Sequence, residues 1–342
     1  MMKAAVLGEF GKPLIIEDIP IPEPQAGEVL VEVLASGVCH SDLHIVDGDL
    51  PGFRARTKAR VVPGHEVIGT VLRCGEGVTS LRDGDRIGVP WLYRACGQCE
   101  QCREGLENLC RKGSAVTGMS VDGGYAQFMC ANADYAVRIP DVLGDAQAAP
   151  LLCAGVTSYR ALRKAQVAAG QRVAVFGVGG LGHLAVQIAR AMGAEVFALD
   201  VSDDKLAFAR EVGADHALNA ADPAALALLR QQGGAHVTAV TSAAHVAYDA
   251  AMSVLRPGGT LCVIGLPAEP LRFQALALAG TEAHIIGSAV GTREDLRAVL
   301  DLAARGAIRC RVETRPLSAV NEVFDAMRRG AIHGRVVLDP RA

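Results

Sequence analysis

The feature that most constrains the fold is a glycine-rich turn between two apolar segments in the second half of the 342-residue chain. An apolar run at residues 172–176 predicts a buried strand, and the pattern at 183–192 predicts an amphipathic helix. The turn between them contains Gly177, Gly179, Gly180, Leu181 and Gly182. A second apolar run at 195–199 ends in Asp200. The glycines alone would be a weak signal, but this order of elements predicts a Rossmann-type dinucleotide-binding unit.

The chemistry of this unit favours NAD as the cofactor. Glycines let the backbone approach a pyrophosphate, and the helix N-terminus adds a partial positive charge. Asp200 is expected to accept hydrogen bonds from the adenosine ribose hydroxyls and to repel a 2′-phosphate, which disfavours NADP. Strands and helices continue to alternate up to residue 286, which predicts an α/β fold with a doubly wound parallel sheet.

A dense cluster of reactive side chains lies nearer the N-terminus, at residues 37–44, with the sequence Gly-Val-Cys-His-Ser-Asp-Leu-His. The pattern predicts a strand end followed by a helix start, because Ser41 and Asp42 suit the first turn of a helix. A thiol at a helix N-terminus is more easily deprotonated. We interpret Cys39 as a ligand of a catalytic zinc ion.

Two residues far along the chain complete a possible ligand set with Cys39. Taken alone, His65 is more typical of a structural histidine, and Cys153 is more typical of a buried core residue. Thiolate and imidazole are both good zinc ligands. Taken together, the three residues form a Cys2His set that leaves one coordination position open for a substrate.

A second metal site is predicted with greater specificity. Four cysteines are separated by two, two and seven residues, namely Cys96, Cys99, Cys102 and Cys110. Four thiolates can close a tetrahedron around one zinc ion and leave no position for substrate, so this site is structural. The spacing is wrong for an iron–sulfur cluster, and disulfides are disfavoured in a chain of this size. The remaining cysteines, in apolar surroundings, are expected to be buried, namely Cys74, Cys130, Cys262 and Cys310.

Composition excludes several classes of function. The net charge is −3, which gives no general attraction to nucleic acid or acidic membranes. No apolar window approaches the ~18 residues of a membrane span, and the N-terminus has no signal-like apolar core. A cytoplasmic, soluble protein is therefore expected. The basic residues at 54–60 alternate, which suits either an anion contact or, more commonly, a solvated loop.

Together these motifs resemble the zinc-dependent medium-chain alcohol dehydrogenases, most closely the bacterial propanol-preferring type, over essentially the whole chain. The resemblance rests on residues 37–44 and 64–66, the four-cysteine lobe, residues 153–157, the glycine turn and residues 264–267, 287–293 and 334–335. It implies a barrel-like, GroES-like catalytic domain at 1–152 and 296–342, with the structural zinc lobe at 94–112. It also implies an inserted NAD-binding domain at 153–295.

Residue roles follow from the same resemblance. Glu66 matches an acid close to the metal, and Asp42 matches the acid that orients the ligand histidine. His40 and Arg335 match pyrophosphate contacts, and Lys205 matches a ribose contact. The nicotinamide pocket corresponds to Thr157, Leu181, Ile264 and Leu266. Trp91, which core packing alone would also explain, matches an aromatic residue of the substrate pocket.

The resemblance implies reversible oxidation of primary and some secondary alcohols, with an alkoxide on the catalytic zinc and hydride transfer to nicotinamide. A proton is expected to leave through Ser41 and His44, in preference to the alternatives that Ser41 only caps the helix and that His44 is a simple surface histidine. Trp91, Leu266 and Val290 suggest small to medium apolar alcohols, benzylic ones included. Two zinc ions per chain and a homotetramer are expected.

Other interpretations fit less well. Metal-free quinone reductases lack both cysteine sets, polyol dehydrogenases usually carry glutamate at the position of Cys153, and glutathione-dependent formaldehyde dehydrogenases are longer. A non-catalytic zinc module would not need the glycine turn. The preferred alcohol stays open at this point.

Overall fold

The computed structural model describes residues 1–267 and 269–342, and these residues form two compact units. The first contains Met1–Cys153, Thr292–Ala304 and Cys310–Ala342, and the second contains Ala154–Gly291 and Arg305–Arg309. The expected boundary at which the chain re-enters the catalytic domain, residue 296, falls inside a helix. In the structure the first unit resumes at Thr292, so that the whole of helix α11 (Arg293–Ala304) belongs to it.

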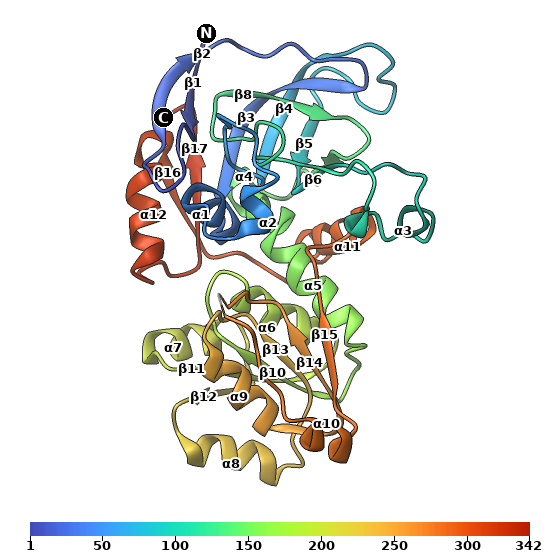
Figure 1. Ribbon diagram of the computed structural model, residues 1–342, viewed down its shortest axis with the longest axis vertical. Helices are drawn as coiled ribbons and strands as arrows, with labels where there is room; N and C mark the ends of the chain where they lie inside the picture. Colours follow the sequence, from blue (N-terminus) through green and yellow to red (C-terminus); the bar gives the residue numbers. More distant parts are fainter. Residues whose placement is uncertain (268) are drawn as a thin grey trace. The chain divides into compact units, whose positions relative to one another are not determined.

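The first unit is built on a seven-stranded sheet in the order β16-β17-β3-β4-β5-β9, with β8 also paired to β3 (Figure 1). Its strands are β3 (Glu28–Val38), β4 (Val67–Cys74), β5 (Arg86–Val89), β8 (Phe128–Asn132), β9 (Val137–Arg138), β16 (Val312–Pro316) and β17 (Arg335–Asp339). Two small sheets pair β1 (Met2–Val6) with β2 (Ile15–Ile19), and β6 (Leu92–Arg94) with β7 (Ala115–Val116).

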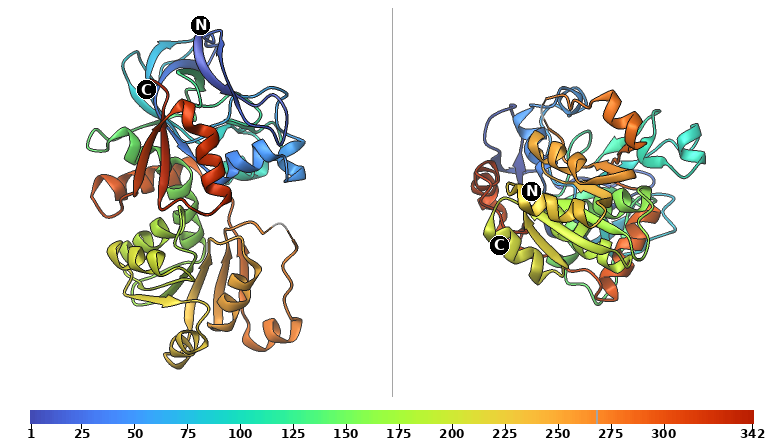
Figure 2. Two further views of the ribbon diagram at one scale, coloured as in Figure 1. Left: turned by 90° about the vertical axis from the view of Figure 1, so that its left-hand side faces the viewer. Right: turned by 90° about the horizontal axis from the view of Figure 1, so that it is seen from below.

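The C-terminal strand β17 brings distant parts of the chain together. Val336 to Leu338 pair antiparallel with Ser36 to Val38, immediately before Cys39. Helix α12 (Val320–Arg328) lies beside β16 and β17 in both figures (Figures 1 and 2). Besides α11 and α12, the helical segments of this unit are α1 (His40–Asp47), α2 (Pro51–Arg54), α3 (Glu100–Arg103), η1 (Glu107–Leu109), α4 (Asp145–Ala148), η2 (Ala149–Leu152) and η3 (Leu317–Ala319).

The second unit is a six-stranded parallel sheet in the order β12-β11-β10-β13-β14-β15. Its strands are β10 (Arg172–Phe176), β11 (Glu195–Asp200), β12 (His216–Asn219), β13 (Ala235–Val240), β14 (Leu255–Val263) and β15 (His284–Gly287). The order reverses between β10 and β13, which is where open α/β sheets bind ligands. The helices are α5 (Ala154–Lys164), α6 (Gly182–Ala191), α7 (Asp203–Glu211), α8 (Pro223–Gln231), α9 (His245–Ser253) and α10 (Ala275–Thr281).

Several local features complete the description. Helix α4 has Gly144 as its N-cap and Asp145 as its first residue. Strand β14 begins at Leu255 and is irregular near its start, where Gly258 has a positive φ of 68° and the pairing with β13 shifts register between Ala235 and Val237. Cys262 and Cys310 are buried as predicted, but Cys74 and Cys130 are only half-buried. None of the helices in the described part of the chain is both long and apolar enough to cross a membrane.

Candidate functional site

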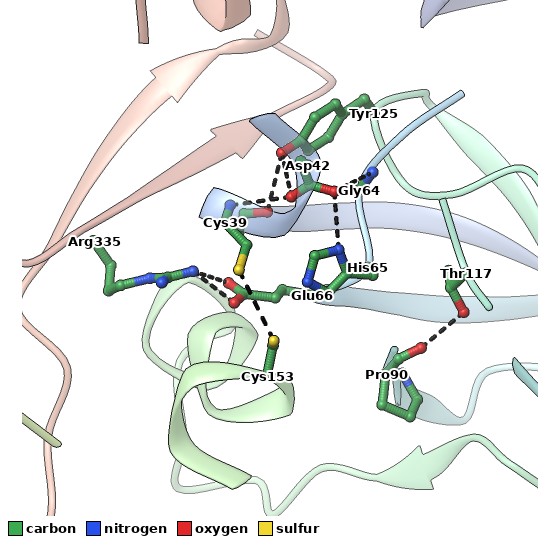
Figure 3. A network of polar contacts seen from close by, with 11 residues as sticks. Cys39, Asp42, Gly64, His65, Glu66, Pro90, Thr117, Tyr125, Cys153 and Arg335 are labelled. Carbon is green, nitrogen blue, oxygen red and sulfur yellow. Dashed lines mark hydrogen bonds and ion pairs between the residues drawn. The ribbon is translucent and has the colours of Figure 1, made fainter. Parts of the chain in front are cut away.

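Residues from separate elements of the first unit meet in one buried cluster (Figure 3). Cys39 is the N-cap of α1, His65 and Glu66 lie just before β4, and Cys153 follows η2. One potential ligand atom from each of the four residues lies within 4.8 Å of those of the other three. The Sγ atoms of Cys39 and Cys153 are 3.9 Å apart. Two thiols, an imidazole and a carboxylate are all ligand types that zinc binds in proteins.

The histidine of the cluster shows that the site suits a cation. His65 is completely buried, and its Nδ1 lies 2.9 Å from Oδ1 of Asp42. Because a carboxylate only accepts hydrogen bonds, Nδ1 carries a proton, and Nε2 is the ring nitrogen left to bind a metal. Among the described residues, Nε2 is buried without a hydrogen-bond partner. A buried polar nitrogen without a partner is costly, and a metal ion that displaces any proton from it would satisfy it.

Asp42 holds this cluster together. Its two oxygens accept hydrogen bonds from the backbone N–H groups of Cys39 and Gly64, at 3.0 and 3.1 Å, in addition to that from His65. The hydroxyl of Tyr125, which is also fully buried, donates a fourth at 2.9 Å. Sequence analysis did not identify Tyr125, because nothing in its neighbourhood marks a buried tyrosine as a partner of Asp42.

Glu66 forms a buried ion pair that sequence analysis also missed. The Arg335 guanidinium lies 2.5 and 2.6 Å from the two Glu66 oxygens, and both side chains are buried. Gly37 makes room for this carboxylate, since a Cβ atom there would lie 2.0 Å from Oε2 of Glu66. The structure therefore pairs Arg335, expected at a pyrophosphate, with the acid of the metal cluster.

The electrostatics of the cluster favour a thiolate. The Cys153 thiol donates toward Cys39 and, with nearby positive groups, holds the pKa of Cys39 well below its usual range, while burial opposes the shift. The same contact raises the pKa of Cys153. Burial alone would lower the pKa of His65, but the charge of Asp42 raises it well above the usual value. A divalent cation would displace the protons that these groups share.

The expected relay residues lie on α1. Ser41 is half-buried there, and helix capping does not explain it, because the N-cap is Cys39 and the carboxylate that caps its N–H belongs to Asp42. His44 is partly exposed, and its Nδ1 lies 2.9 Å from the carboxylate of Asp49. His40 is exposed at the first position of the helix.

The four cysteines of residues 94–112 also converge. Their sulfur atoms lie within 4.8 Å of one another, with 3.9 Å between Cys96 and Cys102 and 4.0 Å between Cys99 and Cys110. A tetrahedron of sulfurs with zinc–sulfur bonds of about 2.3 Å has edges of roughly 3.8 Å. Backbone N–H groups of Gln98 and Cys99 lower the pKa of Cys96 to about 6.

Trp91 lies against the histidine of the metal cluster. The ring centroids of Trp91 and His65 are 4.8 Å apart and the planes are nearly perpendicular, at 85°. The indole is half-buried, and on another side it contacts Phe53 at 5.6 Å. Phe53 was not singled out by sequence analysis.

In the second unit, the glycine turn joins β10 to α6. Gly177 has a φ of +90°, and a Cβ at Gly182 would lie only 1.8 Å from the carbonyl oxygen of Gly177. Gly179 has no such requirement, since a Cβ there would meet nothing within 4 Å. Its lack of a side chain leaves backbone open to a ligand, which fits a pyrophosphate. Gly180 lies beside it in the same turn.

Asp200 ends β11 beside this turn. Its carboxylate accepts hydrogen bonds from the N–H groups of Val178 and Val201, both at 2.8 Å, and of Ser202 at 3.2 Å. These contacts fix the acid next to the glycine turn.

The remaining expected cofactor residues are distributed over the same unit. Leu181 is the N-cap of α6, and its carbonyl accepts from Ser158, the neighbour of Thr157 on α5. Lys205 is half-buried in the first turn of α7, Ile264 is buried after β14, and Leu266 is exposed. Val290, which was expected in the substrate pocket and not at the cofactor, follows β15 with a positive φ of 45°.

Parts of both units match the models of known protein families. Residues 25–141 match the family model described as the alcohol dehydrogenase GroES-like domain, and residues 180–305 match that of the zinc-binding dehydrogenases. An alcohol dehydrogenase of Geobacillus stearothermophilus is 46% identical over 98% of this chain and 99% of its own. The crystal structure of the alcohol dehydrogenase from Aeropyrum pernix matches with a TM-score of 0.91 and 34% identity, over 99% of this chain and all of that one.

A third comparison concerns the cofactor. The acetophenone reductase of Geotrichum candidum, solved in complex with NAD, matches with a TM-score of 0.88 and 34% identity over 99% of this chain and 97% of its own. These matches confirm the predicted combination of a GroES-like domain and a Rossmann domain. The chain belongs to the family of zinc-dependent, medium-chain alcohol dehydrogenases.

Proposed function

We propose that this chain reversibly oxidises primary and some secondary alcohols to aldehydes or ketones with NAD, and that it is of the propanol-preferring type. The observation that carries this proposal is the buried Nε2 of His65, which has no hydrogen-bond partner in the described part of the chain and lies near two thiols and a carboxylate. The glycine turn, with its open position at Gly179, supports the cofactor.

Cys39, His65 and Cys153 would hold the catalytic zinc. When bound, zinc supplies a Lewis acid to the alcohol oxygen and NAD supplies the hydride acceptor. Glu66 is the fourth potential ligand. Because both of its oxygens accept hydrogen bonds from Arg335, Glu66 would be kept from coordinating the zinc. We therefore assign Arg335 the task of keeping one coordination position free, in addition to the expected contact with the pyrophosphate.

We assign proton transfer to residues of helix α1. Ser41 would accept the alcohol proton, and His44 on the same helix would release a proton to solvent. Asp49 holds Nδ1 of His44, which leaves Nε2 to exchange the proton with solvent. His40, exposed at the start of the same helix, would contact the pyrophosphate.

The cofactor residues proposed here are the glycine turn, Asp200 and Lys205 for the adenosine half, and Thr157, Leu181, Ile264 and Leu266 for nicotinamide. Trp91 and Val290 would line the substrate pocket. The catalytic domain corresponds to the first compact unit and the NAD-binding domain to the second.

We also propose a second, structural zinc in the four-cysteine lobe, and a homotetramer. An exposed apolar helix supports assembly: α10 buries none of its residues, and Leu276 is 86% exposed. In addition, β15 lies at the edge of its sheet. A second copy of the chain would cover both features. The ten free cysteines favour a reducing compartment such as the cytoplasm.

One experiment tests the main proposal. Purified protein is analysed for zinc, and the same sample is assayed at 340 nm with NAD and a panel of ethanol, propanol, branched and benzylic alcohols. We expect two zinc ions per chain and NADH formation. Two bound zinc ions without activity on any alcohol would indicate a zinc-binding module instead.

A further inference from the structure

The basic segment at residues 54–60 is exposed but attached to the rest of the first unit. Each of its four basic side chains has a partner within the first unit: Arg54 over the ring of Phe10 at 4.9 Å, Arg56 with Ser114 at 3.2 Å, Lys58 with Asp122 at 2.7 Å and Arg60 with Glu17 at 2.5 Å. These contacts fit the solvated surface loop that the sequence favoured. We call residues 51–60 the strap.

The backbone of the strap is fixed in the same way. The N–H of Lys58 donates to the carbonyl of Met119 at 2.8 Å, and the Thr57 hydroxyl donates to the carbonyl of Phe53 at 2.8 Å. Contacts with Ser114, Met119 and Asp122 therefore hold the strap, and with it Phe53, on the segment 114–122.

That segment also holds the backbone around Trp91. The hydroxyl of Thr117, which is fully buried, donates to the carbonyl of Pro90 at 2.7 Å (Figure 3). The N–H of Thr117 donates to the carbonyl of Trp91 at 3.0 Å. The strap and Trp91 are thus attached to one support.

The rings complete the connection to the metal cluster. Phe53 contacts Trp91 at 5.6 Å with an interplanar angle of 40°, and Trp91 contacts His65 at 4.8 Å. Both Phe53 and Trp91 are partly buried and pack on the same hydrophobic core. Phe53 therefore backs the indole that lies against the metal-binding imidazole.

We propose that Phe53 is a specificity-determining residue, which holds Trp91 against the metal site and thereby favours small alcohols over bulky ones. This inference rests on the proposed alcohol oxidation. Trp91 forms the wall that the substrate meets, and Phe53 acts through Trp91. The strap fixes Phe53, which gives the basic segment its role.

The contact itself can be tested without catalysis, because Trp91 is the only tryptophan in the chain. Intrinsic fluorescence therefore reports on this indole alone. In Phe53→Leu we expect a red-shifted emission and stronger quenching by iodide than in the wild type. The matched control is Phe128→Leu, which removes another half-buried ring from the same core. An unchanged emission and quenching in Phe53→Leu would overturn the proposed packing.

The consequence for specificity is measured with the wild type and both variants as zinc-loaded enzymes. One methylene group in a pocket changes kcat/KM by about 10- to 200-fold. Removing a ring behind the pocket wall should act less strongly. We expect the ratio of kcat/KM for a branched or benzylic alcohol to that for ethanol to rise by about three- to tenfold in Phe53→Leu, and to stay unchanged in Phe128→Leu.

A second variant covers the case in which Phe53→Leu folds poorly. Lys58→Ala removes an exposed ion pair of the strap and leaves every ring in place. It should shift the fluorescence and the substrate ratio in the same direction, by a smaller factor. A fluorescence change with an unchanged ratio in both variants would refute the role in specificity. Loss of the proposed function itself would appear differently, as a wild type without activity on any alcohol.

Discussion

Replacing Asp42 with asparagine tests the structure of the metal cluster most directly. In the structure this carboxylate accepts four hydrogen bonds, from Cys39, Gly64, His65 and Tyr125. An asparagine has one acceptor oxygen with two lone pairs, and its amide nitrogen is a donor. At least two of the four buried donors therefore lose their acceptor.

The size of the effect follows from these contacts. Each buried donor left without an acceptor costs about 1–3 kcal/mol, so Asp42→Asn should lower the free energy of unfolding by roughly 2–6 kcal/mol. The amide also changes the tautomer of His65. If it donates to Nδ1, the ring proton moves to Nε2, and that nitrogen can no longer bind a metal. Loss of such a supporting contact typically lowers metal affinity by about 10- to 100-fold.

Two measurements on one sample separate these effects. Thermal unfolding gives the stability, and competition with a chelator gives the zinc affinity. Because the four-cysteine lobe is a separate cluster, Asp42→Asn should lose one weakly held zinc and keep the other. Tyr125→Phe is the matched control, since it removes one donor and leaves the other three in place. Wild-type zinc affinity in Asp42→Asn would refute the idea that this acid determines the His65 tautomer.

Four other predictions concern three separate parts of the chain. His44→Ala should reduce turnover at neutral pH by at least about tenfold while zinc stays bound, as steady-state kinetics and metal analysis will show, and unchanged rates across pH would rule out the relay. Cys96→Ser should remove one zinc and lower the melting temperature while the other metal cluster stays loaded, and a full complement of two zinc ions would contradict the separate site. Gly182→Ala should destabilise the fold, because its Cβ would lie 1.8 Å from a carbonyl oxygen. Gly179→Ala should keep the wild-type melting temperature but weaken NAD binding in calorimetry, and wild-type affinity would argue against a pyrophosphate at this position.

The strap shows why a charge pattern alone misleads. Alternating basic residues on an extended chain would share one side, which allowed a surface anion contact. The structure instead has helix α2 at its start and turns after it, so the side chains point to four different partners. Each partner lies far away in sequence, from Phe10 to Asp122. No local rule connects such residues.

In the metal cluster, too, the sequence identified some residues and missed some contacts. Cys39, His65 and Cys153 were found because thiol and imidazole are metal ligands wherever they stand, and the motifs around them are local. Tyr125 and the pairing of Arg335 with Glu66 were not found. Both are buried polar contacts across long stretches of sequence, and only packing decides which buried group satisfies which.

By itself, the sequence determined the alternation of strands and helices, the glycine turn and the two sets of cysteine-rich ligands. These depend on local backbone conformation and on the chemistry of single side chains, which are readable residue by residue. The tertiary structure alone decided that β17 lies beside the end of β3, that Arg335 thereby reaches Glu66, and that Phe53 backs Trp91. Such contacts form when distant segments bury their apolar surface together, because the buried polar groups and rings must then find partners among whatever side chains the packing brings near.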